Sequence, residues 1–290
     1  MKKILSTLLI LLLLIGCSES SDQNDELSII TTSYVTYDFV RAIAPNELVT
    51  LLVQPGESAH SFEPTAQDMV TINNSDLFIY TNDGMEPWVN SLIDDSVNKI
   101  DASKKITYID SDHGHEDPHV WTSMRNDQLM VETIRDAIIE VDLEHKELYT
   151  NNADALIEKL EALDKEYASV FEQADIDTIV FLGHFGLNYL MNDYGVEYIA
   201  LFESMSHESE PTIAQLTSII DVIEEENLEV VFIEELASLN IVNTIEKETG
   251  VKTLELNSTH NISLEQYKNG LTFIEIQQQN IENLKVGLYR

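Results

Sequence analysis

The sequence predicts an α/β protein made of two lobes that are joined by a single long helix. Short apolar, β-branched runs alternate with longer amphipathic segments in the first half of the chain, and the same alternation returns in the second half. Between the two halves, from about residue 143 to residue 173, the chain contains no Gly or Pro. A gap in the β pattern without helix breakers indicates a continuous helix.

Each lobe is predicted from four runs that have strand character and are followed by a loop and a helix-like stretch. In the N-terminal lobe, residues 28–142, the runs are Ser28–Thr32, Leu48–Val53, Leu77–Tyr80 and Ile106–Ile109. In the C-terminal lobe, residues 174–290, they are Thr178–Leu182, Glu197–Phe202, Val230–Ile233 and Lys252–Leu256.

The segment 143–173 carries one apolar stripe. Its members recur at steps of 4, 3, 4 and 3, and they are Leu156, Leu160, Leu163, Tyr167 and Val170. A helix of ~30 residues is ~45 Å long, which is enough to run along both lobes. We expect such a strut to be stiff and to permit only modest tilting of the lobes.

The N-terminus predicts secretion and a lipid anchor. Lys2 and Lys3 precede an unbroken apolar run from Leu8 to Ile15, which is shorter than the ~20 residues of a membrane span. Gly16 and Cys17 follow, in the pattern of a bacterial lipoprotein cleavage site. We therefore expect a signal peptide at 1–16, lipidation of Cys17 and a polar tether at 17–27, which leaves the protein extracytoplasmic and membrane-anchored.

The charge of the chain excludes some partners. Its formal net charge is −36, from 16 basic and 52 acidic residues. A field of this sign opposes binding to nucleic acid and to anionic lipid surfaces. The acidic residues are spread along the whole chain, which favours adaptation to a salty or alkaline medium over a role in concentrating cations.

Three histidines follow predicted strands. His60 comes after the second run, His119 after the fourth and His184 directly after the fifth. Ligands of open α/β sheets bind beyond the carboxyl ends of the strands. If the two lobes face each other, these imidazoles meet in one cleft and suit Zn²⁺, which takes about four ligands.

The motifs around these histidines resemble those of the zinc and manganese solute-binding lipoproteins of ABC importers, the metal-binding cluster A-I family. The matching motifs, in order along the chain, are His60-Ser-Phe-Glu-Pro-Thr65, Asp117-Pro-His-Val-Trp121, His184 with Tyr189 and Tyr194-Gly195, and Glu208-Ser-Glu-Pro-Thr212. The resemblance runs from about Ser28 to Leu288 and implies two (β/α)₄ lobes joined by a long rigid helix, with a metal in the cleft between them.

The same resemblance implies function and ligands. It implies a monomeric binding protein rather than an enzyme, which delivers its metal to an importer permease with its ATPase. His60, His119 and His184 fall on the first three ligand positions. A histidine at the third position favours Zn²⁺, with Mn²⁺ as the alternative, because imidazole suits zinc and oxygen ligands suit manganese.

The fourth ligand position departs from the family pattern. Members usually place an aspartate after the last strand, where this chain has Asn257. We expect His260, three residues on, or a water to complete the site, with Asn257 as the alternative. Glu57 and Asp117 are candidates to orient the ligand histidines, whereas we expect Glu234 to be structural.

Two further features leave alternatives open. The acidic segment 110–117 contains His113 and His115, which either form a weak auxiliary metal site or belong to a solvated loop. We expect Trp88 and Trp121 to be packing residues. Besides metal delivery, an adhesin role and a zinc-dependent hydrolase are alternatives, and the absence of a His-Glu-x-x-His sequence disfavours the hydrolase.

Overall fold

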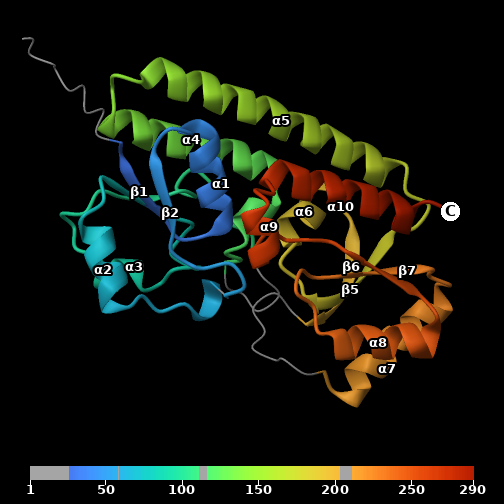
Figure 1. Ribbon diagram of the computed structural model, residues 1–290. Helices are drawn as coiled ribbons and strands as arrows, with labels where there is room; N and C mark the ends of the chain where they lie inside the picture. The colour runs from blue at the N-terminus through green and yellow to red at the C-terminus, as the bar shows by residue number, and fades with distance from the viewer. Residues whose placement is uncertain (1–25, 58, 111–115, 203–210) are drawn as a thin grey trace, which may run out of the picture.

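The computed structural model describes residues 26–57, 59–110, 116–202 and 211–290, and it folds into two α/β lobes under one long helix (Figure 1). The predicted signal peptide and Cys17 lie outside the described residues. None of the helices that the structure describes is long and apolar enough to cross a membrane.

Each lobe is built on a four-stranded parallel sheet. The N-terminal sheet contains β1 (Ser28–Thr31), β2 (Leu48–Leu51), β3 (Leu77–Tyr80) and β4 (Lys99–Asp101) in the order β2-β1-β3-β4. The C-terminal sheet contains β5 (Thr178–His184), β6 (Glu197–Phe202), β7 (Val230–Ile233) and β8 (Lys252–Glu255) in the order β6-β5-β7-β8. In both sheets the strand order thus reverses beside the first strand, β1 or β5. Ligands of such sheets bind at the point where the strand order reverses.

One predicted strand is wrong. The segment Ile106–Ile109 forms no strand, and the fourth strand of the N-terminal sheet is β4, which pairs with β3. Ile106, Tyr108 and Ile109 pack against the hydrophobic core without pairing with the sheet. The apolar side chains of this segment are therefore explained by packing against the core and not by strand pairing. By contrast, all three residues of β4 are only partly buried, so this strand has little apolar character.

The helices cover the sheets, and several of them begin at polar caps. In the N-terminal lobe they are α1 (Tyr34–Ile43), α2 (Ala66–Asn73), α3 (Val89–Leu92) and α4 (Met124–Val141), with 3₁₀ turns at Ala59–Ser61 and Val120–Thr122. In the C-terminal lobe they are α6 (Asn188–Tyr194), α7 (Ile213–Glu225), α8 (Leu239–Thr249), α9 (Leu264–Lys268) and α10 (Phe273–Leu288). Thr65 and Thr212 each form a capping box, which satisfies main-chain N–H groups at a helix start.

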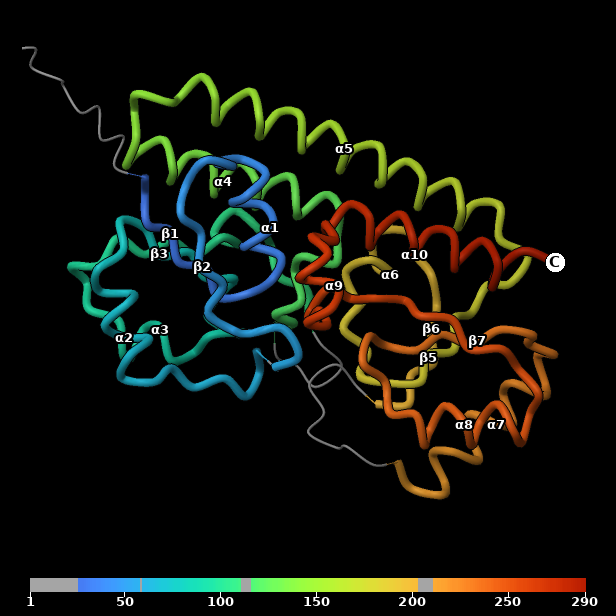
Figure 2. Tube along the Cα trace, viewed as in Figure 1, coloured from blue at the N-terminus to red at the C-terminus, as the bar shows by residue number. Residues whose placement is uncertain are grey.

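The long helix α5 (Lys146–Glu172) occupies most of the segment predicted to be helical and runs along both lobes (Figure 2). Its buried face includes the predicted stripe from Leu156 to Val170. This face contacts α1 and α4 on the N-terminal side and α10 on the C-terminal side. One hydrophobic core therefore continues from Phe39 in α1 through Leu160 to Phe181 in β5.

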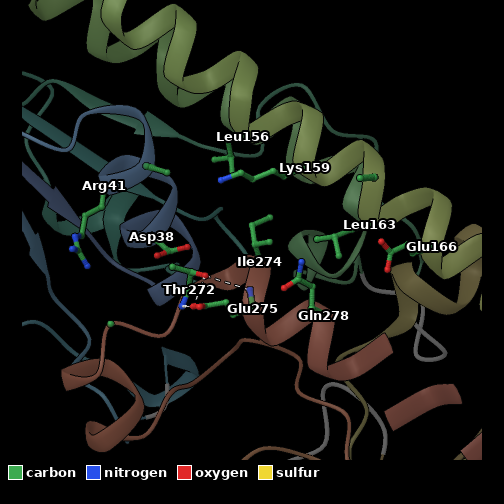
Figure 3. A pocket seen from close by; sticks show the side chains of 13 residues that line it. Asp38, Arg41, Leu156, Lys159, Leu163, Glu166, Thr272, Ile274, Glu275 and Gln278 are labelled. Carbon is green, nitrogen blue, oxygen red and sulfur yellow. Dashed lines mark hydrogen bonds between the residues drawn. The ribbon is translucent and has the colours of Figure 1, made fainter. Parts of the chain in front are cut away.

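A cavity of about 540 Å³ lies where α1, α5 and α10 meet (Figure 3). Asp38, Lys159 and Glu166 line it together with apolar side chains such as Leu163. Its lining contains no histidine or cysteine, and it lies on the helical side of the molecule. The site suggested by the sequence must be sought at the strand ends instead.

Candidate metal centre

Four histidines lie beyond the carboxyl ends of the two sheets. His60 is in the 3₁₀ turn after β2, and His119 precedes the 3₁₀ turn that leads into α4. His184 ends β5, and His260 lies in the loop after β8. The parallel topology of both sheets brings these loops together, although the first and last histidines are 200 residues apart in sequence.

Three of these imidazoles form a cluster. The Nε2 atoms of His60 and His119 are 3.1 Å apart. The His260 ring lies 4.7 Å from the His60 ring and 6.0 Å from the His119 ring between centroids. Two ligand atoms of a tetrahedral zinc ion are ~3.3 Å apart, given bonds of ~2.0–2.1 Å, so the His60 and His119 nitrogens have close to that spacing.

His119 is fixed by its neighbours. Its Nδ1 lies 2.7 Å from an Asp117 oxygen, and Asn188 of the C-terminal lobe donates a 2.5 Å hydrogen bond to the other oxygen. Burial alone raises the pKa of Asp117, but the contacts with His119 and Asn188 outweigh burial and hold this pKa below its usual range. An ionised Asp117 accepts from Nδ1–H, which leaves Nε2 of His119 as the metal-facing acceptor.

The C-terminal lobe also approaches His119 through its main chain. A Cβ atom at Gly186 would lie 3.3 Å from Cδ2 of His119, which is tighter than most such contacts. Tyr189, in α6, donates a 2.7 Å hydrogen bond to the Asp117 carbonyl. The His119 segment is therefore held between the two lobes.

His260 presents an acceptor that is not satisfied by protein. Its Nε2 atom is shielded from solvent and has no hydrogen-bond partner within the part of the chain that the structure describes. Burial, followed by the neighbouring His60, His119 and His184, lowers the pKa of His260 well below its usual value. The ring is therefore neutral at physiological pH, as a metal ligand must be.

The loop around His260 has its own framework. Glu235, just after β7, accepts hydrogen bonds from the Ser258 main chain at 2.9 Å and the Ser258 hydroxyl at 2.7 Å. Burial raises the pKa of Glu235 to about 7, although these bonds from Ser258 counteract it. Asn280 of α10 pairs with both main-chain groups of Asn257 at 2.8 Å each.

Asn257, the alternative fourth ligand, uses its side chain within this framework. Its Oδ1 accepts the Thr259 N–H at 2.7 Å, and its Nδ2 donates to a Glu255 oxygen at 2.9 Å. Thr259 adopts a positive φ of 59°, so the local hydrogen bond stabilises a tight turn. Of the two candidates for the fourth ligand, His260 is the one with a nitrogen atom available to bind a metal.

His184 has neighbours within the C-terminal lobe. Its Nδ1 is 3.7 Å from Glu234 Oε1, and its ring stacks on Phe202. A Cβ atom at Gly183 would lie 2.7 Å from Cδ of Glu234, so the glycine leaves room for Glu234 beside β5. Glu234, expected to be structural, thus lies next to a candidate ligand.

The structure does not bring together every residue that the sequence suggested. The Glu57 carboxylate accepts the Gln54 N–H at 3.3 Å and has no hydrogen bond to a histidine among those found in the described residues. His113 and His115 lie outside the described residues. Glu235, a residue that supports the loop of His260, was not identified from the sequence. The two consecutive glutamates directly after an apolar strand were a signal that could have found it.

The clustered imidazoles are close together but are not arranged as a complete metal site. Within the described residues, no three His, Cys, Asp or Glu side chains are already arranged to hold one ion. Imidazole donors select zinc or other borderline metals over calcium and magnesium.

Comparisons with known proteins agree in family and fold. The family described as "zinc-uptake complex component A, periplasmic" matches residues 29–287. The chain is 35% identical to the zinc-binding lipoprotein AdcA of Streptococcus pneumoniae serotype 4, over 98% of this chain but only 61% of that protein. It is 33% identical to the high-affinity zinc uptake system protein ZnuA of Bacillus subtilis, over 96% of this chain and 94% of that one.

Solved structures show the same architecture. The Zn(II)-bound ZnuA-like domain of S. pneumoniae AdcA superimposes with a TM-score of 0.81 at 34% identity, covering 91% of this chain and all of that one. The laminin-binding protein Lmb of Streptococcus agalactiae, described as a bifunctional protein with adhesin and metal transporting activity, gives a TM-score of 0.77 at 27% identity, covering 90% of this chain and all of that one. The chain spans about three fifths of the length of AdcA, the first of these relatives.

Proposed function

The chain belongs to the ZnuA family of zinc-uptake components, and on that premise we propose that it captures Zn²⁺ outside the cytoplasm and delivers it to the permease of an ABC importer. The family consists of uptake components that bind a metal, so the protein is not an enzyme. The cluster of imidazoles between the lobes supports capture, and the names of the relatives support the cargo.

The ligand set that we propose is His60, His119, His184 and His260. The observation that carries it is the shielded Nε2 of His260, which has no partner in the described chain and lies beside the His60 and His119 rings. A buried polar atom without a partner is costly, and a metal ion that binds there removes the cost. Four imidazoles favour Zn²⁺ over Mn²⁺.

The site is tested by metal analysis. Protein purified without added metal should carry zinc, and in competition with Mn²⁺ it should retain zinc. The His260→Ala variant should lose zinc affinity, while Asn257→Ala should retain more of it because the Asn257 amide is engaged within its own loop. Unchanged zinc binding by His260→Ala would exclude this histidine as a ligand.

Delivery requires an anchor and a docked permease. We propose that Cys17 is lipidated after removal of residues 1–16 and that residues 17–27 tether the protein to the membrane. The lobes at 28–142 and 174–290, with the helix segment 143–173 between them, then form one rigid carrier. Replacement of Cys17 by Ser should release the protein into the medium, which a fractionation experiment detects.

The acidic segment 110–117 remains a proposed auxiliary site. Deletion of Ser111–Glu116 should reduce bound zinc from two equivalents to one if His113 and His115 bind, and should leave one equivalent unchanged if they do not. Counting zinc per chain by mass spectrometry under native conditions distinguishes these outcomes.

An adhesin role is a second candidate because two solved relatives are named as laminin-binding proteins. A genetic experiment separates the two functions. Loss of an uptake component causes a growth defect that excess zinc rescues, whereas loss of an adhesin reduces attachment to laminin and leaves growth in zinc-poor medium intact.

A further inference from the structure

Residues 257–261, here called the His260 loop, are bound to the N-terminal lobe as well as to their own. Trp121 donates its indole N–H to the Ser258 carbonyl at 2.8 Å. The indole is only 1% exposed, so this bond is shielded from water. A residue of the N-terminal lobe therefore fixes the main chain two residues before His260.

The same indole also packs against two candidate ligands. Its ring is nearly parallel to the His260 ring, at 19° with 6.1 Å between centroids, and lies 5.3 Å from the His119 ring. Trp121 thus limits the positions of both imidazoles. A packing role, as the sequence suggested, describes only part of these contacts.

A second contact between the lobes begins at the turn 54–57. Glu57 donates its main-chain N–H to the Gln54 carbonyl at 2.9 Å, Pro55 takes the second position, and Gly56 has a φ of +90°. These are the features of a type II turn, which favours Gly at its third position. The turn leaves the Gly56 N–H and the Glu57 carbonyl directed outward.

Asn261 pairs with both of these groups. Its Oδ1 accepts the Gly56 N–H at 2.9 Å, and its Nδ2 donates to the Glu57 carbonyl at 2.8 Å. The side-chain amide of Asn261 thus satisfies one main-chain N–H and one main-chain carbonyl of the turn, as the main chain of a paired strand would. Asn261 directly follows His260, and Glu57 lies three residues before His60.

There is little free space behind this contact. The cavity between the turn and the His260 loop, lined by Gln54, Glu57, His260 and Asn261 among others, measures about 10 Å³. That volume holds at most about one water molecule. The turn and the His260 loop are therefore closely packed, and the Asn261 hydrogen bonds hold them together.

We propose that Trp121 and Asn261 are positioning residues that hold the His260 loop against the N-terminal lobe before zinc arrives. His260 then belongs functionally to the same half-site as His60 and His119, although it comes from the C-terminal lobe. The proposal rests on the zinc-binding function proposed above. Pre-ordered ligands bind more tightly because less conformational entropy is lost on binding.

Two substitutions remove these contacts while they keep the local structure. Trp121→Phe retains an aromatic ring against His119 and His260 but lacks the N–H for Ser258. Asn261→Ser retains a hydroxyl that can accept the Ile262 N–H, as Asn261 does at 2.7 Å, but is too short to reach the turn.

Each variant has a matched control. Trp88→Phe is the same chemical change at an indole whose N–H has no hydrogen-bond partner in the described chain. Asn283→Ala removes an amide that donates to the Glu255 carbonyl at 2.7 Å entirely within the C-terminal lobe. Neither control residue contacts the histidines in the described structure.

The first measurement is zinc affinity and dissociation rate, obtained by competition with a chromophoric chelator. Loss of one or two hydrogen bonds should weaken zinc binding about tenfold in Trp121→Phe and in Asn261→Ser, with faster dissociation. The two controls should stay close to the unmodified protein. Equal affinity of a variant and its control would overturn the proposal for that residue.

The second measurement is made without zinc. Amide exchange at Gly56, followed by NMR, should be slower in the unmodified protein and in Asn283→Ala than in Asn261→Ser. Exchange at Gly56 that is equally fast in all three would show that the contact forms only after binding and would overturn pre-ordering. Failure of the unmodified protein to bind zinc would instead refute the underlying function.

Discussion

Asp127 stands out at the scale of single residues because it is buried without a partner. It lies in α4, is fully buried, and neither carboxyl oxygen has a hydrogen-bond partner within the described chain. Burial, followed by the charge of Asp193, raises its pKa well above its ordinary value. Below the ordinary pKa of an aspartate the residue is protonated in both the folded and the unfolded state, so its ionisation does not affect stability.

The pH dependence of stability follows from this shift. As pH rises above ~4, the unfolded chain ionises Asp127 while the folded chain resists, so the free energy of unfolding falls until the raised folded pKa is passed. Asp127→Asn should therefore stabilise the protein by ~1–3 kcal/mol at pH 7 and have little effect near pH 3. Thermal unfolding across this pH range measures the difference.

An exposed aspartate provides the control for that prediction. Asp177 lies on the surface just before β5, so Asp177→Asn should leave the pH dependence unchanged. An Asp127→Asn variant that is less stable than the parent at pH 7 would show that Asp127 has a partner when ionised.

Asp117 illustrates how one carboxylate can prepare a proposed zinc ligand. Its contact with His119 Nδ1 fixes the ring, so Asp117→Asn should lower zinc affinity by ~10–100-fold, as is typical for residues behind a metal ligand. The matched control is Asp142→Asn, because Asp142 contacts His145 Nδ1 at 2.6 Å far from the cluster. Isothermal titration with zinc compares the two, and equal affinities would argue against the orienting role.

At the scale of elements, α5 is the helix that packs against both lobes. Leu160 is fully buried on its central turn and contributes to the core that both lobes share. Leu160→Ala should cost ~2–5 kcal/mol of stability because it leaves a cavity. Zinc stoichiometry should stay the same, since the histidines belong to other elements.

Chemical denaturation monitored by circular dichroism measures this loss. Glu158→Ala, two residues away on the exposed face of the same helix, should change stability by less than about 0.5 kcal/mol. If Leu160→Ala unfolded the two lobes in separate transitions, the shared core would not couple them.

At the scale of the whole molecule, the continuous core and the contacts between the lobes limit motion. Zinc capture should therefore produce only small tilting of the lobes, and solution scattering of the zinc-free and zinc-loaded protein should be closely similar. A large change in the radius of gyration on adding zinc would contradict the rigid connection.

Zinc should instead act on stability. A ligand that binds only the folded state at a hundredfold excess over its Kd stabilises that state by ~2.7 kcal/mol. Thermal unfolding with excess zinc should occur at a higher temperature than with chelator, and the His260→Ala variant should show a smaller shift. Identical unfolding temperatures with zinc and chelator would contradict binding to the folded state.

The local elements could be read from the sequence with few errors. The runs Leu77–Tyr80, Glu197–Phe202 and Val230–Ile233 coincide with strands β3, β6 and β7, because strands of parallel sheets are largely apolar. The stripe on α5 was equally clear. The strand predicted at Ile106–Ile109 was wrong because an apolar segment can pack against the core without joining a sheet.

By itself, the sequence therefore determined the two α/β lobes, the long helix and the histidines at the strand ends, since these depend on local periodicity and on motifs. Only the tertiary structure decided that His260 lies beside His60 and His119, that the Asn257 side chain is engaged elsewhere, and that Trp121 and Asn261 join the lobes. Apart from the bonds of Asn257 within its own loop, these contacts connect residues 100 or more positions apart. Their geometry depends on how two sheets and one helix pack, and no local pattern specifies that.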